Sequence, residues 1–368
     1  MSSFVYDYLT NDYLATIKSK TLTCTPANSP GIVNTGVATL TPWALLCDVV
    51  FFVANTTANY SKPRRSVGVS RTPDPTRWPQ PTPSLVADEI DDRWASSAAA
   101  RLQGNRTELC ERTHTPPYDT WFSGDISDRL RVFSDGLSAF GYQTQYIGFL
   151  WVAHFGPGGP KDPRGPTDVA DGTIEVEVVS SRDGQHWRRA DPAQDGERPQ
   201  LLPRGPEPWD AMMIHTSTHP LLVDGKLHLY FQGDSCSHHG GYCMKPKTPT
   251  GIGLAMLRRD GWASLAHNST APPGYVFTQP VGVGSGDSLR VNYKASAGGS
   301  LRVALYPLTG TAMPGRTAAD CTPLTGDSTN QSVTWAGTGP NGSADPDRVF
   351  IKFVFEGEVE LYSYSISQ

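Results

Sequence analysis

The chain has 368 residues, of which 38% are hydrophobic and 18% charged, so it can bury a packed core and wholesale disorder is excluded. Its formal net charge is -5 and it contains no run of Lys or Arg, which argues against a nucleic-acid-binding protein. With 36 Gly and 31 Pro, the composition favours many short strands joined by turns.

Membrane and targeting signals are weak. The apolar run 43–54 contains Asp48 and is too short to cross a bilayer, so no membrane span is expected. Residues 1–20 lack the apolar core of a signal peptide. Six N-x-S/T sequons favour the secretory route instead; they lie at Asn55, Asn59, Asn105, Asn268, Asn330 and Asn341. The sequence leaves the localisation open, with secretion as one possibility.

Residues 1–59 show no clean periodicity and are left as an unassigned N-terminal segment. A repeat begins after residue 60. Alternating apolar residues end at a serine, and an aspartate then precedes a tryptophan by four positions, as in Asp74 and Trp78 or Asp183 and Trp187. The two clear copies and one weaker copy are residues 66–78, 175–187 and 252–262.

Each copy predicts a β-hairpin whose tryptophan packs back over the turn, and each hairpin would form the outer half of a four-stranded sheet. Residues 145–152 would supply the inner half for the second copy. Repeated four-stranded antiparallel sheets are the blades of a β-propeller. Within this scheme Glu175 and Glu177 would face one side of a middle strand without a catalytic role. The acidic cluster 88–92 would face solvent.

The strongest local signal is a pair of β-rich runs, 212–223 and 226–231, joined by Asp224-Gly225. Asp-Gly between such runs is typical of a tight hairpin turn. Asp210 stands just before the first run, and Asp234 just after the second. The two ends of a hairpin lie side by side, so we expect a functional site here.

One turn carries a recognisable motif, S-x-D-G-x-x-W, at residues 181–187. It resembles the blade turn of the five-bladed propeller glycoside hydrolases, the group that holds invertases, levanases and arabinanases. From about residue 60 to the C-terminus, the sequence resembles a glycoside hydrolase family 32-like branch. The other matching features are Val69-Ser70-Arg71, Asp88-Glu89-Ile90-Asp91, Tyr146-Ile147-Gly148, Trp209-Asp210 and Leu229-Tyr230-Phe231-Gln232-Gly233.

Two elements of invertase-like enzymes are missing from the chain, W-M-N-D-P-N-G and R-D-P. Residues before 60 are also too few for two further blades of roughly 40–50 residues each. The expected fold is therefore all-β, with a five-bladed-propeller-like domain at 60–273 that is complete or lacks blades. Short strands with Gly-rich turns over 274–368 predict a C-terminal β-sandwich, which the resemblance also implies.

Glycoside hydrolysis needs two carboxyl groups that flank the scissile bond. Asp125 and Asp210 hold equivalent places before the innermost strands of successive blades, and such positions converge on the central channel of a propeller. We therefore predict Asp125 and Asp210 as the catalytic pair. Asp234 is added as a third candidate because it follows the second run of the hairpin. For each of them, a solvated or strand-capping acid is the alternative.

Four further side chains are predicted to bind substrate. Trp209 could stack on a sugar ring, and His215, His238 and His239 could hydrogen-bond sugar hydroxyls. Ordinary packing or loop roles are the alternatives. Cys236 and Cys243 flank the two loop histidines, but the spacing is not that of a structural zinc site, so no metal is predicted and a local disulfide is favoured. No cofactor motif is present.

The leading hypothesis is a glycoside hydrolase-like protein that hydrolyses glycosidic bonds of an unidentified carbohydrate with paired carboxylates. The rival is a non-catalytic carbohydrate-binding or interaction propeller, a degenerate hydrolase. Fold does not decide between them. Hydrolysis of a glycan that is lost in Asp210→Asn would favour the enzyme, whereas glycan binding without hydrolysis would favour the rival.

Overall fold

The computed structural model describes residues 3–7, 10–22, 63–85, 88, 90–91, 132–156, 164–166, 171–193, 196–268, 271–284, 287–336 and 348–367. The described residues are dominated by β-strands, which confirms the prediction of an all-β chain. The chain divides into two compact units, residues 1–221 with 228–255 and residues 222–227 with 256–368. The predicted domains 1–59, 60–273 and 274–368 stay predictions.

Sheet A of the first unit is antiparallel, in the order β1 (Ser3–Asp7), β2 (Asp12–Leu22), β3 (Pro63–Thr72) and β4 (Thr82–Leu85). The first repeat copy forms β3 and β4. Its inner half comes from β1 and β2, which lie in the segment that the sequence left unassigned. Pairing extends from Tyr13 opposite Thr72 to Leu22 opposite Pro63.

Sheet B begins with a second four-stranded section, β5 (Val132–Tyr142), β6 (Gln145–Phe155), β7 (Gly172–Ser181) and β8 (Trp187–Arg189). Strand β6 pairs with β7 over its whole length, which confirms the predicted inner half of the second repeat. In the turn, Gly184 has a φ of 70°, and Trp187 Nε1 donates to the Gly184 carbonyl at 2.9 Å. The tryptophan therefore packs back over its turn as predicted.

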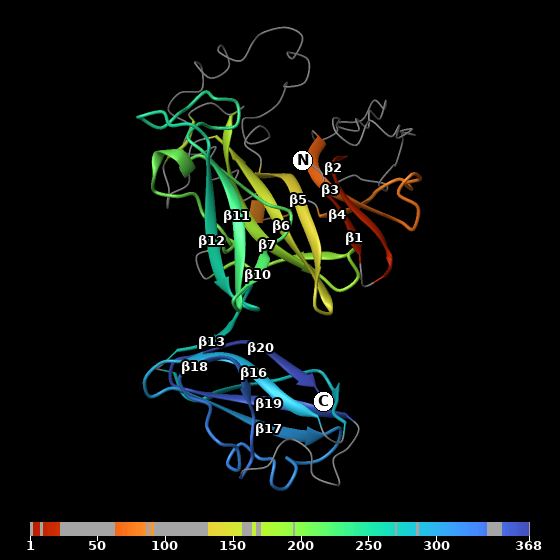
Figure 1. Ribbon diagram of the computed structural model, residues 1–368, viewed down its shortest axis with the longest axis vertical. Helices are drawn as coiled ribbons and strands as arrows, with labels where there is room; N and C mark the ends of the chain where they lie inside the picture. Colours follow the sequence, from red (N-terminus) through yellow and green to blue (C-terminus); the bar gives the residue numbers. More distant parts are fainter. Residues whose placement is uncertain are drawn as a thin grey trace, which may run out of the picture. The chain divides into compact units, whose positions relative to one another are not determined.

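The rest of sheet B contains β9 (Met213–Thr216), β10 (Leu221–Val223), β11 (Lys226–Asp234) and β12 (Gly251–Arg258). A single residue pair, Ile174 with Met213, links this part to β7 in parallel. Sheet B is thus one curled sheet (Figure 1), and a propeller of five blades is not confirmed. The two sheets share a core in which Leu14, Val69 and Leu150 are buried.

Asp7 is the centre of one of the polar contacts between sheet A and sheet B. Asp7 is buried, and its Oδ2 accepts hydrogen bonds from Arg71 Nη1 at 2.5 Å and from the Tyr146 hydroxyl at 2.5 Å. Arg71 also contacts Asp12 at 2.8 Å. Because Tyr146 belongs to β6, a carboxylate from β1 joins two sheets whose strands lie far apart in the sequence.

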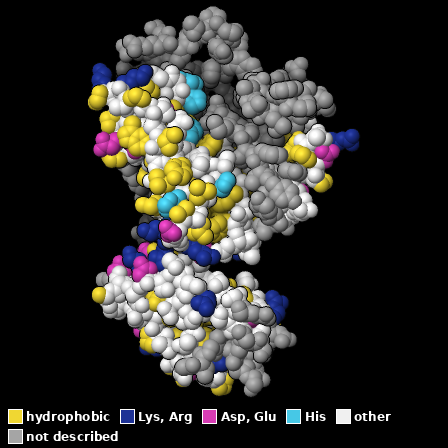
Figure 2. Space-filling model, viewed as in Figure 1, with side chains coloured by type: hydrophobic (Ala, Val, Ile, Leu, Met, Phe, Trp, Pro, Cys, Tyr) yellow, Lys and Arg dark blue, Asp and Glu magenta, His cyan; other side chains and the backbone are white. Residues whose placement is uncertain are grey.

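Strand β12 has an apolar outer face. Figure 2 shows hydrophobic side chains gathered over β10–β12, and within the first unit Ile252 is 82% exposed and Leu254 43% exposed. Phe231 on β11 is partly buried, and it lies on the opposite face of the sheet from Ile252 and Leu254. Among the described residues, β12 pairs with β11 alone. The strand therefore forms an edge of sheet B.

The second unit consists of two antiparallel sheets around one core. The first sheet contains β13 (Leu265–His267), β20 (Val359–Ser367), β16 (Ser288–Ala295) and β18 (Asp327–Ser332). The second contains β14 (Gly274–Phe277), β19 (Arg348–Glu356), β15 (Val281–Gly282) and β17 (Ser300–Pro307). Residues from both sheets bury a common cluster, with Trp335 and Ile351 at 0% exposure. Two facing sheets of this kind are typical of a β-sandwich.

Candidate functional site

The predicted hairpin forms, and it brings its two ends together. Asp224 and Gly225 both have positive φ, 49° and 72°, as a type I′ turn requires. Strands β9 and β11 pair antiparallel with Asp234 opposite Met213. The Met212 amide donates to the Asp234 carbonyl at 2.9 Å. The backbone that carries Asp210 therefore lies beside the end of β11.

Asp210 ends the short 3-10 helix η2 (Pro208–Asp210), and its side chain is 8% exposed. Room for it comes from two glycines: a Cβ on Gly205 would collide with the carboxyl group, and one on Gly233 would lie 2.7 Å from Asp210 Cβ. Oδ1 is buried without a hydrogen-bond partner among the described residues. Larger side chains at the two glycines would displace the carboxyl group.

The pKa of the Asp210 carboxyl is raised. Burial is the main cause, and the negative charge of Glu207 adds to it. Backbone N–H donors and the positive charge of Arg164 act in the opposite direction. A carboxyl group that holds its proton to higher pH is suited to donate that proton in a reaction.

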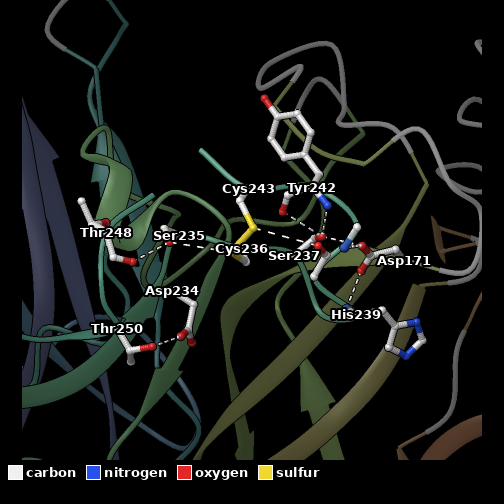
Figure 3. Close-up of a disulfide and its surroundings, with 12 residues drawn as sticks. Asp171, Asp234, Ser235, Cys236, Ser237, His239, Tyr242, Cys243, Thr248 and Thr250 are labelled. Carbon is white, nitrogen blue, oxygen red and sulfur yellow. Dashed lines mark hydrogen bonds between the residues drawn. A yellow bond between two sulfur atoms is a disulfide. The ribbon is translucent and has the colours of Figure 1, made fainter. Parts of the chain in front are cut away.

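Asp234 lies beside Asp210 in the backbone but faces the other way. Gly233 contacts Asp210, and successive residues of a strand point to opposite faces. Accordingly, the Asp234 carboxylate accepts a hydrogen bond from Gln232 Nε2 at 2.9 Å. It accepts a second one from Thr250 Oγ1 at 2.5 Å (Figure 3). His215 pairs across the strands with Gln232, so it shares the face of Asp234. The carboxyl groups of Asp210 and Asp234 therefore lie on opposite faces of β11, an arrangement in which they do not flank the same glycosidic bond.

Trp209 packs against protein. Its ring stacks on Phe231 with centroids 5.8 Å apart and 17° between the planes. A Cβ on Gly251 would lie 2.6 Å from Trp209 Cε3, and one on Gly253 would collide with Phe231. The two glycines of β12 thus leave space for two rings, which is a structural use of strand glycine. The ring of His215 likewise packs edge to face against the ring of buried Trp151, with the two ring centroids 5.4 Å apart.

The loop after β11 is closed by a disulfide between Cys236 and Cys243 (Figure 3), the pairing favoured by the sequence. The loop packs around Asp171, which directly precedes β7 in the chain and is 1% exposed. Asp171 was not among the predicted site residues. Its carboxylate accepts from Ser237 Oγ at 2.5 Å, from the His239 amide at 2.7 Å and from the Gly241 amide at 2.8 Å. Asp171 therefore fixes the backbone that carries the two histidines.

The rings of His238 and His239 pack edge to face, with their centroids 4.7 Å apart. His239 is exposed and His238 is partly buried. Among the described residues, no cluster of His, Cys, Asp or Glu could hold a metal ion. The local chemistry of this loop is therefore that of imidazole donors and acceptors at the surface.

Sequence reasoning also missed a buried ion network on β7. Glu175 accepts from Arg204 Nε at 2.9 Å and lies 3.3 Å from His154 Nδ1. Burial alone would raise the pKa of Glu175, but His154 and Arg204 lower it to about 2. Arg204 Nη1 also donates to the Ala211 carbonyl at 3.0 Å, next to Asp210. Arg204 thus links the ionised Glu175 carboxylate to the backbone next to Asp210, whose carboxyl has a raised pKa.

For Asp91, a second network corrects the expectation that the acidic cluster faces solvent. Asp91 is 4% exposed and pairs with Arg189 at 2.7 Å. The same arginine binds Glu177 at 2.8 Å, and Arg198 holds Asp88 at 2.5 Å. Asp91 is buried because arginines from the segment after β7 neutralise it, a pairing that no local pattern announces.

Asp125, the other predicted catalytic residue, lies outside the described residues. Within the part of the chain that the structure describes, no helical segment has the length and hydropathy of a membrane span.

Comparisons with known proteins give structural similarities only. No family model and no curated protein sequence matches the chain. Among solved structures, it is similar to an N-acetylgalactosamine deacetylase from F. plautii in complex with blood group B trisaccharide. The identity is 10% and the TM-score 0.34, over 71% of this chain and 50% of that chain. A structure described as a glycoside hydrolase gives 9% and 0.33, over 70% and 46%.

A glycoside hydrolase family 43 arabinoxylan arabinofuranohydrolase from Bacillus subtilis, in complex with cellotetraose, gives 11% identity and a TM-score of 0.28. That alignment covers 100% of this chain and 66% of the other. The chain spans about half the length of the first two structures. The comparisons do not assign the chain to a family, and the resemblance to glycoside hydrolase family 32 is not confirmed.

Proposed function

We propose that the first unit is a glycoside hydrolase-like protein that hydrolyses glycosidic bonds of a carbohydrate, with Asp210 as the general acid. The observation that supports this most is the Asp210 carboxyl: it is buried, its pKa is raised, and its Oδ1 has no partner among the described residues. A buried polar atom without a partner calls for an explanation, and a ligand is one.

The reaction needs a proton at the leaving-group oxygen and a nucleophile or base on the other side of the sugar. Asp210 would give its proton to the glycosidic oxygen as the bond to the anomeric carbon breaks. An ionised carboxylate would attack that carbon or activate a water. Asp125 is our proposal for this second group, on the sequence argument alone. Asp234 is not proposed as the partner of Asp210 because it faces the opposite side of β11.

Of the predicted substrate-binding residues, the three histidines and Trp209 have different roles in this proposal. His215, His238 and His239 stay proposed as hydrogen-bond partners of sugar hydroxyls. Trp209 stacks on Phe231 and packs against Gly251, so a role in packing beside Asp210 fits it better than a role as a free stacking surface. Asp171 would act as a positioning residue, because its carboxylate holds the backbone of the loop that carries His238 and His239.

The test is release of reducing sugar from a panel of neutral and acidic glycans. Asp210→Asn and Asp125→Asn should each abolish release, with the melting temperature retained. Asp224→Asn makes the same chemical change at the exposed hairpin turn, where Asn also tolerates positive φ, and should leave activity unchanged. Glycan binding without hydrolysis by the unaltered chain, or full activity of Asp210→Asn, would overturn the proposal, the former in favour of the non-catalytic rival.

A further inference from the structure

The second unit carries three aromatic rings around one lysine on the outer face of a sheet. We call Tyr275, Phe277, Tyr306 and Lys352 the aromatic–lysine patch. In the sheet, Lys352 of β19 stands opposite Phe277 of β14 on one side and Ala304 of β17 on the other. Tyr275 lies two residues before Phe277 on β14, and Tyr306 lies two residues after Ala304 on β17, so all four side chains share a face. The neighbouring residues of β19 point into the core.

The Lys352 ammonium lies near all three rings. Lys352 Nζ lies 4.3 Å from the Tyr275 ring centroid, 5.5 Å from that of Phe277 and 5.9 Å from that of Tyr306. Phe277 is nearly perpendicular to both tyrosines, at 80° and 77°, with centroids 5.8 and 5.2 Å away. Tyr275 and Phe277 expose ring surface beside the ammonium.

Two properties distinguish this patch from ordinary sheet surface. Tyr275 is 66% exposed and Phe277 43% exposed, although aromatic rings of this size usually bury most of their surface. Within the described residues no carboxylate pairs with Lys352, whose contacts are with the three rings. A cation that has no carboxylate partner within the described part of the chain, beside the exposed rings of Tyr275 and Phe277, is complementary to a ligand that has both a negative charge and an apolar face.

Size decides which class of ligand fits. A side chain of this type presents about 150–250 Å² when fully accessible, so the exposed parts of Tyr275 (66%) and Phe277 (43%) together offer roughly 160–270 Å². A standard protein interface needs about 800 Å² on each partner. Attachment to an anionic membrane surface typically uses clusters of about 4–8 basic residues, whereas the patch has one. A single sugar ring is of the right size.

We propose that the aromatic–lysine patch binds acidic sugar residues of a polysaccharide. The C–H face of a uronate ring would lie against Tyr275 and Phe277, and its carboxylate would contact the Lys352 ammonium. The site belongs to the second unit and does not depend on the hydrolysis proposed for the first. Its function is attachment to a charged glycan, whatever bond the first unit cleaves.

The test is affinity electrophoresis of the full chain in gels that contain polygalacturonate or the same polymer with its carboxyl groups methyl-esterified. Polygalacturonate should retard the chain, and the neutral ester should retard it far less. Lys352→Met keeps the alkyl stem and should weaken retention about tenfold or more, since it removes a charge-assisted contact. Tyr275→Ala and Phe277→Ala should weaken it as well. Leu265→Ala removes an exposed side chain from the other sheet and should leave retention unchanged.

Each other outcome overturns the inference. Absence of retardation, equal retardation by the esterified polymer, or unchanged retention of Lys352→Met would each do so. Binding to phosphatidylserine vesicles without binding to the polysaccharide would assign the patch to membranes. Asp210→Asn separates the two proposals, because it should be retarded like the unaltered chain even where it hydrolyses nothing.

Discussion

Glu175→Gln tests the buried ion network of β7. Because ionised Glu175 has a pKa of about 2 in the folded chain against 4.5 for a free side chain, its charged form is stabilised by folding. One pKa unit corresponds to about 1.36 kcal/mol, so this group contributes about 3 kcal/mol at neutral pH. Removing one partner of a buried ion pair costs a similar amount, about 3–5 kcal/mol. We expect Glu175→Gln to destabilise the first unit by about 3 kcal/mol at pH 7.

The pH dependence gives the sharper test. A lowered pKa stabilises the fold above the unfolded pKa, and this contribution is lost as the pH falls towards the folded pKa. The difference between the unaltered chain and Glu175→Gln should therefore shrink below about pH 4.5, and by about pH 3 more than half should be gone. Urea unfolding followed by tryptophan fluorescence measures it, with the exposed Glu207→Gln as control. A difference that stays constant from pH 6 to pH 3 would refute the reasoning.

Three further changes test other parts of the first unit. Gly253→Ala should cost about 1–3 kcal/mol in urea unfolding because the new Cβ meets the Phe231 ring, and Phe231→Leu should relieve it; purely additive costs would contradict the contact. Asp171→Asn places an amide donor against backbone N–H groups, so limited proteolysis should cut the disulfide loop faster, and an unchanged rate would argue against the anchoring role. Since a raised pKa disfavours ionised Asp210 in the fold, its contribution to stability is lost as pH rises through that pKa. Asp210→Asn should then melt at or above the temperature of the unaltered chain at pH 7, and a clearly lower melting temperature would count against a strained carboxylate.

Local turn chemistry made part of the fold predictable. The Asp224-Gly225 hairpin and the turn that ends at Trp187 both depend on residues a few positions apart, so their motifs predict them. The pairing of β6 with β7 followed from the alternation of apolar residues. The inner half of sheet A did not, because Tyr13 pairs with Thr72 far along the chain and nothing local records that distance.

The site was predictable in its backbone and less so in its side chains. Asp210 and Asp234 come together because a hairpin brings its ends together, but which face each carboxyl group takes depends on register. The burial of Glu175 could not be predicted from the sequence because its partner Arg204 comes from a separate segment. A carboxylate among valines suggests a solvated strand face until the arginine that neutralises it is known.

The contact made by Asp7 has a practical consequence for anyone who trims the chain at the start of its recognisable repeat. A version that begins at residue 60 would keep every motif by which the sequence is recognised and still lose two strands of its first sheet. It would also leave the guanidinium of Arg71 against the Tyr146 ring without its buried counter-ion. Sheet A therefore begins well upstream of the residues that carry the resemblance.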